Sequence, residues 1–135
     1  MIVIDASAAI LALLNDGEAR AMLREGAVVC PHLADSELAH VLRSQVLRGD
    51  LKAADAGRAI DVWGRLGIER IGVQRLLPRI WELRENVSAY DATYVAVAEA
   101  LEVPLVTADG ALLGHQARAV RSRWFPADRA GWRSR

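Results

Sequence analysis

Four carboxylates of this sequence stand at the ends of short apolar segments, where a fold can bring charges together. Asp5 follows the run MIVI, and Glu37 lies early in a helix-like segment after the run AVVC. Asp91 opens the apolar segment YDATYVAVAEAL, and Asp109 comes just after the run VPLVT. In an open α/β sheet, ligands bind at the carboxyl ends of the strands, where loops and helix N-termini gather. We therefore expect the four side chains to meet at one edge of a sheet.

Four like charges at one edge repel one another unless something offsets them. At a separation of ~4 Å and an effective dielectric constant of about 20, each pair costs on the order of 4 kcal/mol, which exceeds what a helix cap contributes. A divalent cation removes this repulsion, and a site made of oxygen ligands suits Mg²⁺ or Mn²⁺ better than Zn²⁺. Such an ion acidifies a bound water and neutralises charge on a phosphoryl oxygen. The pattern therefore predicts metal-assisted hydrolysis of a phosphodiester.

Each acid also has a local explanation that involves no ligand. Ser88 and Asp91 have the spacing of an N-cap followed three residues later by an acid. Asp5 can cap the helix that follows it, and Glu37 is favourable near a helix N-terminus. Asp109 is followed by glycine, as in many turns. Taken singly these signals are weak, and only the convergence of the four acids favours a site.

Short apolar runs alternate with helix-like segments along the chain. Strand-like runs occur at 1–5, 27–30, 68–73, 103–107 and 119–124. Helical spacing of apolar residues predicts helices at 7–15, 16–26, 31–49, 51–67, 74–86 and 90–101. The alternation predicts an α/β fold, in which a central, mostly parallel sheet of four to five short strands is flanked by helices in a three-layer sandwich. We expect residues 1–135 to form one domain.

Some of these helices carry more specific expectations. The apolar face of the helix at 51–67 is predicted to consist of Ile60, Val62, Trp63 and Leu66. Trp63 and Trp81 are predicted to lie in the core or in a dimer contact. Asp16 is predicted to be the N-cap of the helix at 16–26.

Charge is balanced over the whole chain but not along it. There are 17 basic and 17 acidic residues, yet from residue 115 onward six arginines face one acid. Arg121 and Arg123 flank the aromatic pair Trp124 and Phe125 in this tail, with Arg129 nearby. Cations interleaved with aromatics are typical of RNA-contact surfaces, so Arg121 and Arg123 are candidate RNA contacts. The alternatives are a solvated tail and docking of this edge onto the sheet.

Composition excludes several other classes. The sequence has no uncharged apolar run long enough to span a bilayer, and its N-terminus lacks the basic residues of a secretory signal. We expect a cytoplasmic protein without membrane contact. Cys30 is the only cysteine, and it is expected to be buried. His32, His40 and His115 are too dispersed for a zinc motif and are assigned to structure or surface.

Several stretches together resemble a known family. VIDASA at the start, SEL near residue 37, YDATYVAVAEAL and PLVTAD are similar to the PIN-domain ribonucleases, specifically the VapC toxins of toxin–antitoxin pairs. The resemblance covers nearly the whole chain. It implies a Mg²⁺- or Mn²⁺-dependent endoribonuclease that stops translation, forms a homodimer and is neutralised by a cognate VapB-type antitoxin whose C-terminal segment enters the active-site groove. The family's acidic site and its supporting hydroxyls fall on Asp5, Glu37, Asp91, Asp109, Ser7 and Thr107.

The working hypothesis assigns these residues two kinds of role. Asp5, Asp91 and Asp109 contact the metal directly or through water, while Glu37 holds or deprotonates the attacking water. Two other acidic α/β enzymes are disfavoured. A haloacid-dehalogenase-type phosphatase needs an aspartate where Ser7 stands, and a phosphoacceptor receiver needs a late lysine, whereas Lys52 is the only lysine. A catalytically silent PIN-like module that acts only by binding a protein partner or RNA is the non-enzyme alternative.

Overall fold

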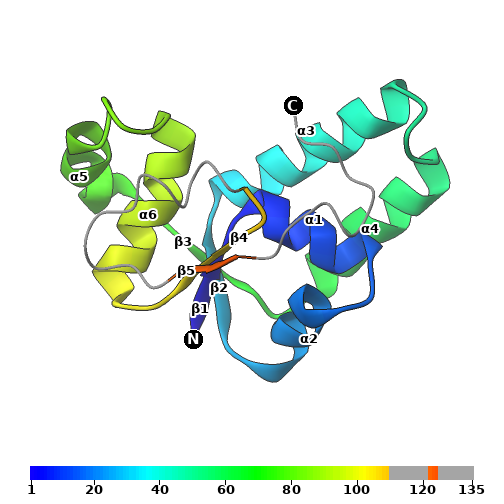
Figure 1. Ribbon diagram of the computed structural model, residues 1–135, viewed down its shortest axis with the longest axis horizontal. Coiled ribbons are helices and arrows are strands. Elements are labelled where there is room, and N and C mark those ends of the chain that lie inside the picture. Colours follow the sequence, from blue (N-terminus) through cyan, green and yellow to red (C-terminus); the bar gives the residue numbers. More distant parts are fainter. Residues whose placement is uncertain (110–121, 125–135) are drawn as a thin grey trace.

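Five short parallel strands form the centre of the protein in the part of the chain that the structure describes. The structure is a computed structural model, and it describes residues 1–109 and 122–124. The strands are β1 (Ile2–Ile4), β2 (Val28–Pro31), β3 (Glu69–Ile71), β4 (Leu105–Thr107) and β5 (Ser122–Trp124). They lie in the order β3-β2-β1-β4-β5, and every pairing is parallel (Figure 1). The predicted parallel sheet is therefore confirmed, and β5 is an edge strand as expected.

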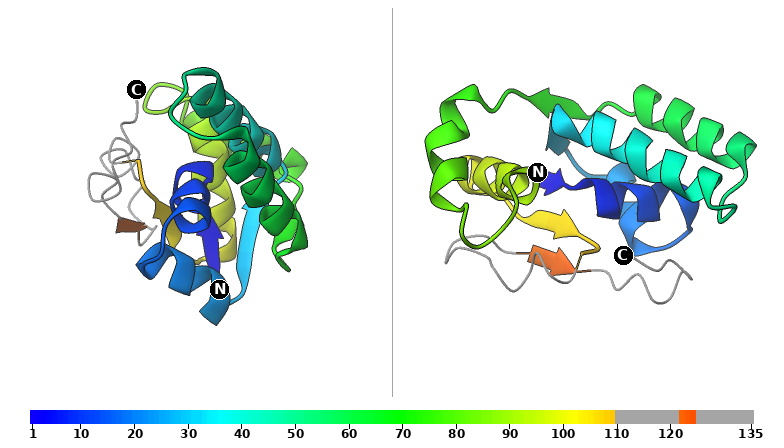
Figure 2. Two further views of the ribbon diagram at one scale, coloured as in Figure 1. Left: turned by 90° about the vertical axis from the view of Figure 1, so that its right-hand side faces the viewer. Right: turned by 90° about the horizontal axis from the view of Figure 1, so that it is seen from above.

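Helices cover both faces of this sheet. They are α1 (Ala6–Leu14), α2 (Glu18–Glu25), α3 (Leu33–Leu47), α4 (Ala53–Arg65), the short 3₁₀ helix η1 (Gln74–Leu76), α5 (Leu77–Glu82) and α6 (Ala89–Leu101). Figure 1 shows α5 and α6 on one side of the sheet and α1 to α4 on the other, and Figure 2 shows the layers from two further directions. This is the three-layer α/β sandwich that the alternation of segments predicts.

The middle strands are apolar because helices bury them on both faces. Val3 of β1 lies beside Val29 of β2 and Leu105 of β4, and all three side chains are buried. The helix α6 packs against β1, β2 and β4, and its residues 92–98 are all buried. A helix that is apolar on every side belongs in the core of a protein. The N-terminus of α6, which carries Asp91, is thereby held at the carboxyl ends of these strands.

The apolar face predicted for α4 is partly wrong. Trp63 is buried together with Ala56 and Ala59, but Ile60 and Val62 are 46% and 47% exposed. The inward stripe follows positions 56, 59 and 63, which recur at helical intervals, and Ile60 and Val62 flank it on either side. Leu66, just past the helix end, is partly buried against the core.

Two further local expectations also need correction. Asp16 does not cap α2, because the N-cap is Gly17 with a φ of 152°, and Asp16 instead pairs with Arg20 one turn later. A positive φ of this kind suits glycine and not aspartate. Trp81 is exposed, which rules out the core and leaves the dimer contact as a prediction, and its ring lies 4.9 Å from the guanidinium carbon of Arg84. Pro78 stands in the first turn of α5, where a missing N–H costs nothing.

None of the helices in the described ranges, 1–109 and 122–124, is long and apolar enough to cross a membrane.

Candidate active site

Asp5 is a buried carboxylate at the point where β1 passes into α1. It is the N-cap of α1, and its Oδ1 accepts hydrogen bonds from Ala8 N at 2.9 Å and from Ser7 Oγ at 2.7 Å. Its Oδ2 accepts a hydrogen bond from Thr107 Oγ1 at 2.5 Å. The side chain is only 5% exposed. The capping explanation and the site explanation thus apply to the same carboxyl group, and three hydrogen bonds fix its orientation.

The hydroxyls of Ser7 and Thr107 connect Asp5 to the end of β4. Ser7 Oγ lies 3.3 Å from Thr107 Oγ1 and accepts a hydrogen bond from Ala108 N at 2.9 Å. Thr107 Oγ1 accepts a hydrogen bond from Asp109 N at 3.0 Å. These bonds hold the backbone that carries Asp109 against the start of α1. The sequence places both hydroxyls beside the site, and the structure brings them there.

Asp91 interacts electrostatically with each of the other three acids. It lies in the first turn of α6, where the Ser88 side chain accepts a hydrogen bond from its backbone N–H at 3.1 Å. The predicted Ser88 cap is therefore confirmed, and the Ser88 side chain also acts on the Asp91 carboxyl, whose pKa it lowers. The charge of Asp91 raises the pKa values of Asp5 and Glu37, and that of Asp109 raises the pKa of Asp91. The structure thus brings Asp5, Glu37 and Asp109 each within electrostatic reach of Asp91.

Glu37 reaches the site from the second turn of α3, not from the start of the helix. The helix begins at Leu33 with His32 as its N-cap residue, which makes no side-chain capping bond. The Glu37 side chain is half-buried, and this burial raises the pKa of its carboxyl. Its Oε1 is buried and has no hydrogen-bond partner among the described residues. An acceptor of this kind calls for a ligand, a water or an ion.

The start of α3 is held in place by a cluster of Asp35, Trp63 and Arg70, which begins two residues before Glu37. The Asp35 carboxylate accepts hydrogen bonds from Trp63 Nε1 at 2.7 Å and from Arg70 Nη2 at 2.8 Å. The guanidinium of Arg70 lies 5.2 Å from the centre of the Trp63 ring. These contacts, and the pairing with Arg70 above all, hold the pKa of Asp35 below its usual range. The cluster joins α3, α4 and β3, and so fixes the helix turn that carries Glu37.

Burial first, and then repulsion, raise the pKa values of Asp5, Glu37 and Asp91. The pKa of Asp5 is raised from 3.8 to about 6, chiefly by burial and in small part by the charge of Asp91, although its hydrogen bonds to Thr107, Ala8 and Ser7 act in the opposite direction. Burial also raises the pKa values of Glu37 and Asp91. Carboxyls shifted together in this way mark a functional site more often than a structural one.

The carboxylates fit a hard divalent cation that is held partly through water. Within residues 1–109, no three acids, histidines or cysteines are close enough together to enclose an ion by themselves. Mg²⁺ commonly takes only one or two carboxylates directly and keeps several waters, so it does not need such a closed set. The repulsion centred on Asp91 and the unpaired oxygen of Glu37 both favour a cation between these groups.

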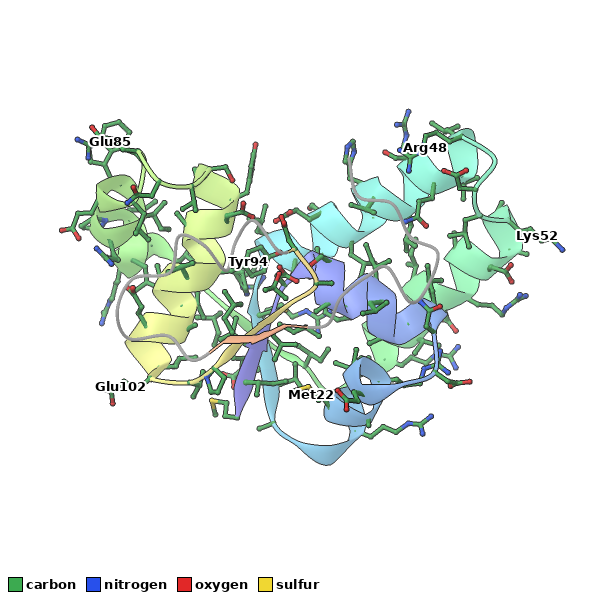
Figure 3. All side chains as sticks on the ribbon, in the orientation of Figure 1. Met22, Arg48, Lys52, Glu85, Tyr94 and Glu102 are labelled. Atoms are coloured by element: carbon green, nitrogen blue, oxygen red, sulfur yellow. The ribbon has the colours of Figure 1, made fainter. Side chains whose placement is uncertain are left out.

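One polar group at the site is not predicted from the sequence. Tyr94 belongs to the segment YDATYVAVAEAL, which the sequence pattern predicts only as an apolar helix. In the structure its side chain is buried and its hydroxyl interacts with Glu37. The sequence offers one indication of this role, which is that a tyrosine stands in an apolar helix. A buried tyrosine hydroxyl usually has a polar partner. Figure 3 labels Tyr94 near the centre of the molecule, between α6 and the start of α3.

The candidate RNA contacts fall mainly outside the described residues. Arg121, Phe125 and Arg129 lie outside them, and only the backbone of Arg123 and Trp124 is described, within β5. The backbone pairing of β5 with β4 agrees with docking of this edge onto the sheet.

Known proteins are similar to this chain in sequence and in fold. A family model described as the PIN domain matches residues 2–116. "VapC ribonuclease Mb0985" of Mycobacterium bovis is 56% identical over 109 residues, which are 81% of this chain and 86% of that protein. "Ribonuclease VapC1" of Mycobacterium tuberculosis is 41% identical, over 82% of this chain and 86% of its own length.

Solved structures support the same fold. PAE2754 from Pyrobaculum aerophilum superimposes with a TM-score of 0.65 at 25% identity, covering 90% of this chain and 82% of that chain. VapC20 of Mycobacterium tuberculosis, described as a sarcin-ricin loop cleaving toxin, gives a TM-score of 0.60 at 20% identity, with 90% and 99% covered. The latter likeness concerns the fold alone. Given the matching family model and the close relatives, this chain belongs to the PIN domain family, among the VapC-type ribonucleases.

Proposed function

We propose that residues 1–135 act as one PIN-like ribonuclease domain, a metal-dependent endoribonuclease and the toxin of a VapBC-type toxin–antitoxin pair. It hydrolyses phosphodiester bonds of RNA in the cytoplasm and thereby inhibits translation. The observation that carries the proposal is Asp5, a buried carboxylate held by Ser7 and Thr107 within reach of the Asp91 charge. The names of the close relatives, which are ribonucleases, support the reaction class.

Three acids would hold Mg²⁺ or Mn²⁺, directly or through water. Asp5 is fixed by its hydrogen bonds, Asp91 by the first turn of α6, and Asp109 by the bond of its backbone to Thr107. When bound, the ion acidifies a water and neutralises charge on the phosphate. The hydrogen bonds keep the Asp5 carboxylate and the backbone of Asp91 and Asp109 in place before the ion arrives, which limits the reorganisation that accompanies its binding.

Glu37 acts on the attacking water. Its pKa is raised by burial, which makes its carboxylate a better proton acceptor than an exposed glutamate. Glu37 takes a proton from the water, the oxygen attacks phosphorus in line, and the bond from phosphorus to the departing oxygen breaks.

The proposed partners follow from the family. A cognate VapB-type antitoxin would cover the acidic groove with its C-terminal segment, and the protein would act as a homodimer without membrane contact. Arg121 and Arg123 are proposed RNA contacts. Replacing both with alanine should weaken RNA binding and flatten its dependence on salt, because fewer counterions are then released.

Metal-dependent cleavage of RNA tests this function. Purified, antitoxin-free protein is incubated with total cellular RNA in the presence of Mg²⁺ or Mn²⁺, and separately with a chelator, beside the variant Asp5→Asn. The proposal predicts discrete fragments that require metal and disappear in the variant. A folded protein that neither cleaves RNA nor binds Mn²⁺ would contradict it and favour the catalytically silent binding module.

A further inference from the structure

The hydroxyl of Tyr94 is a buried polar group that makes no hydrogen bond of good geometry within the described residues. Tyr94 lies in the middle of α6, and its side chain is 1% exposed. The hydroxyl oxygen is buried and makes no well-aligned hydrogen bond with any described residue. A buried donor left without a bond is costly, and phenylalanine would fill the same space without this cost. The hydroxyl therefore needs an explanation other than packing.

A second buried atom without a hydrogen bond of good geometry belongs to Glu37, whose side chain interacts with Tyr94. Glu37 Oε1 is also buried and also lacks a hydrogen-bond partner in the described part of the chain. The two groups are near neighbours, since the Glu37 carboxylate raises the pKa of Tyr94 and the Tyr94 hydroxyl stabilises the charged form of Glu37. Phenol and carboxylate are complementary, because one donates and the other accepts.

The helix α6 presents Tyr94 on the face that carries Asp91. The two residues are three positions apart, and residues at this spacing are neighbours on a helix surface. The charge of Asp5 also raises the pKa of Tyr94, so the hydroxyl lies close to the acids of the site. A link from Tyr94 to Glu37 would thus fix α3 relative to the helix that positions Asp91.

On the proposed function, we infer that Tyr94 is a positioning residue, whose hydroxyl donates a hydrogen bond to the Glu37 carboxylate and holds it toward the metal-binding acids. Tyr94 acts through Glu37 and touches neither the ion nor the RNA. Outer partners of this kind in metal sites are commonly worth about 10–100-fold in metal affinity or activity. The loss of one neutral donor belongs at the lower end of that range.

The chain offers a matched control, because Tyr90 is its only other tyrosine and is 63% exposed. The full-length variants Tyr94→Phe and Tyr90→Phe are compared with the wild type for Mn²⁺ affinity by calorimetry and for unfolding midpoint with chelator. Tyr94→Phe should weaken Mn²⁺ binding by about tenfold but shift the metal-free midpoint only slightly, because the lost hydrogen bond to Glu37 is largely offset by removal of a buried hydroxyl, while Tyr90→Phe should change neither. In the background Glu37→Gln, Tyr94→Phe should cause less than a twofold further loss, because the residue acts through the Glu37 carboxylate.

Two results would overturn the inference. One is Mn²⁺ binding by Tyr94→Phe that matches the wild type, and the other is an equal loss with and without the Glu37 carboxylate. Either result leaves the ribonuclease proposal standing, since the wild type still binds metal. Failure of the wild type to bind Mn²⁺ would instead contradict the proposed function and remove the inference with it.

Discussion

The Thr107 hydroxyl donates a 2.5 Å hydrogen bond to Asp5 Oδ2 and accepts a 3.0 Å hydrogen bond from Asp109 N. One side chain at the end of β4 therefore orients the carboxylate at the end of β1 and the backbone of a second acid. Parallel strands bring their carboxyl ends to one edge of a sheet, and this hydroxyl converts that general placement into a fixed geometry.

Replacing Thr107 with valine keeps the shape of the side chain but removes this link. We expect Thr107→Val to lower the free energy of unfolding by about 1–3 kcal/mol, because it leaves a buried carboxylate oxygen without its donor. Urea unfolding at pH 7 measures the change. Thr93 is a suitable control, since it is buried but its hydroxyl donates only to the carbonyl of Ala89 within α6. Thr93→Val should cost less, and an equal cost for both variants would contradict the special role of Thr107.

Burial of Asp5 makes the metal-free protein less stable as the pH rises. The folded state holds this proton up to about pH 6, whereas the ordinary pKa is 3.8. Between these values the folded state binds more protons than the unfolded chain, so the free energy of unfolding falls with increasing pH. At about 1.4 kcal/mol per pKa unit, the loss is on the order of 3 kcal/mol. The raised pKa values of Glu37 and Asp91 act in the same direction.

Urea unfolding with chelator at pH 4.5 and pH 7 measures this dependence. The variant Asp5→Asn cannot lose that proton, so its stability should vary less with pH and should exceed that of the wild type at pH 7. The exposed Asp61, which pairs with Arg65, provides the control Asp61→Asn, which should keep the wild-type slope. A wild-type protein whose stability rises steadily from pH 4.5 to 7 would contradict the assignment.

Asp35 is expected to matter for stability more than any exposed ion pair. Its carboxylate accepts hydrogen bonds from Trp63 and Arg70, and the Arg70 side chain is largely buried. Because Asp35 itself is partly exposed, we expect Asp35→Ala to cost about 1–2 kcal/mol, not the full cost of breaking a buried pair. Asp61→Ala, which breaks an exposed pair, should cost less than about 1 kcal/mol. Thermal unfolding distinguishes the two, and equal midpoints for both variants would show that the cluster does not fix α3.

Much of this arrangement could be predicted from the sequence because local rules and the fold agree. MIVI and VPLVT predict buried parallel strands, and an acid directly after such a strand must lie at the sheet edge. Ser88 was recognised as an N-cap from its spacing to Asp91, and the structure contains that bond. At Ser88 the capping role that the local spacing predicts is the one that the folded protein shows.

Other features depend on packing that no local pattern contains. Ile60 and Val62 fit an apolar helix face, but the neighbouring helices bury only the stripe through Trp63. Glu37 is a residue type favoured in the first turn of a helix, yet it lies in the second turn of α3, where its tertiary position and not capping decides its surroundings. Tyr94 differs from its apolar neighbours by one hydroxyl, and the significance of that atom depends on α3, a separate helix. Such relationships exist only once distant segments have come together.

The central claim is that the four acids form one metal pocket around Asp91, and the cleavage rate of Asp91→Asn tests it most directly. This variant keeps the backbone bond to Ser88 and removes a repulsive charge, so it should fold as the wild type does. Because even outer partners of metal ligands cost about 10–100-fold, we predict that Asp91→Asn lowers the Mn²⁺-dependent rate of RNA cleavage by about 100-fold or more, while Asp61→Asn leaves it unchanged. A folded Asp91→Asn protein that cleaves RNA at the wild-type rate would contradict the account.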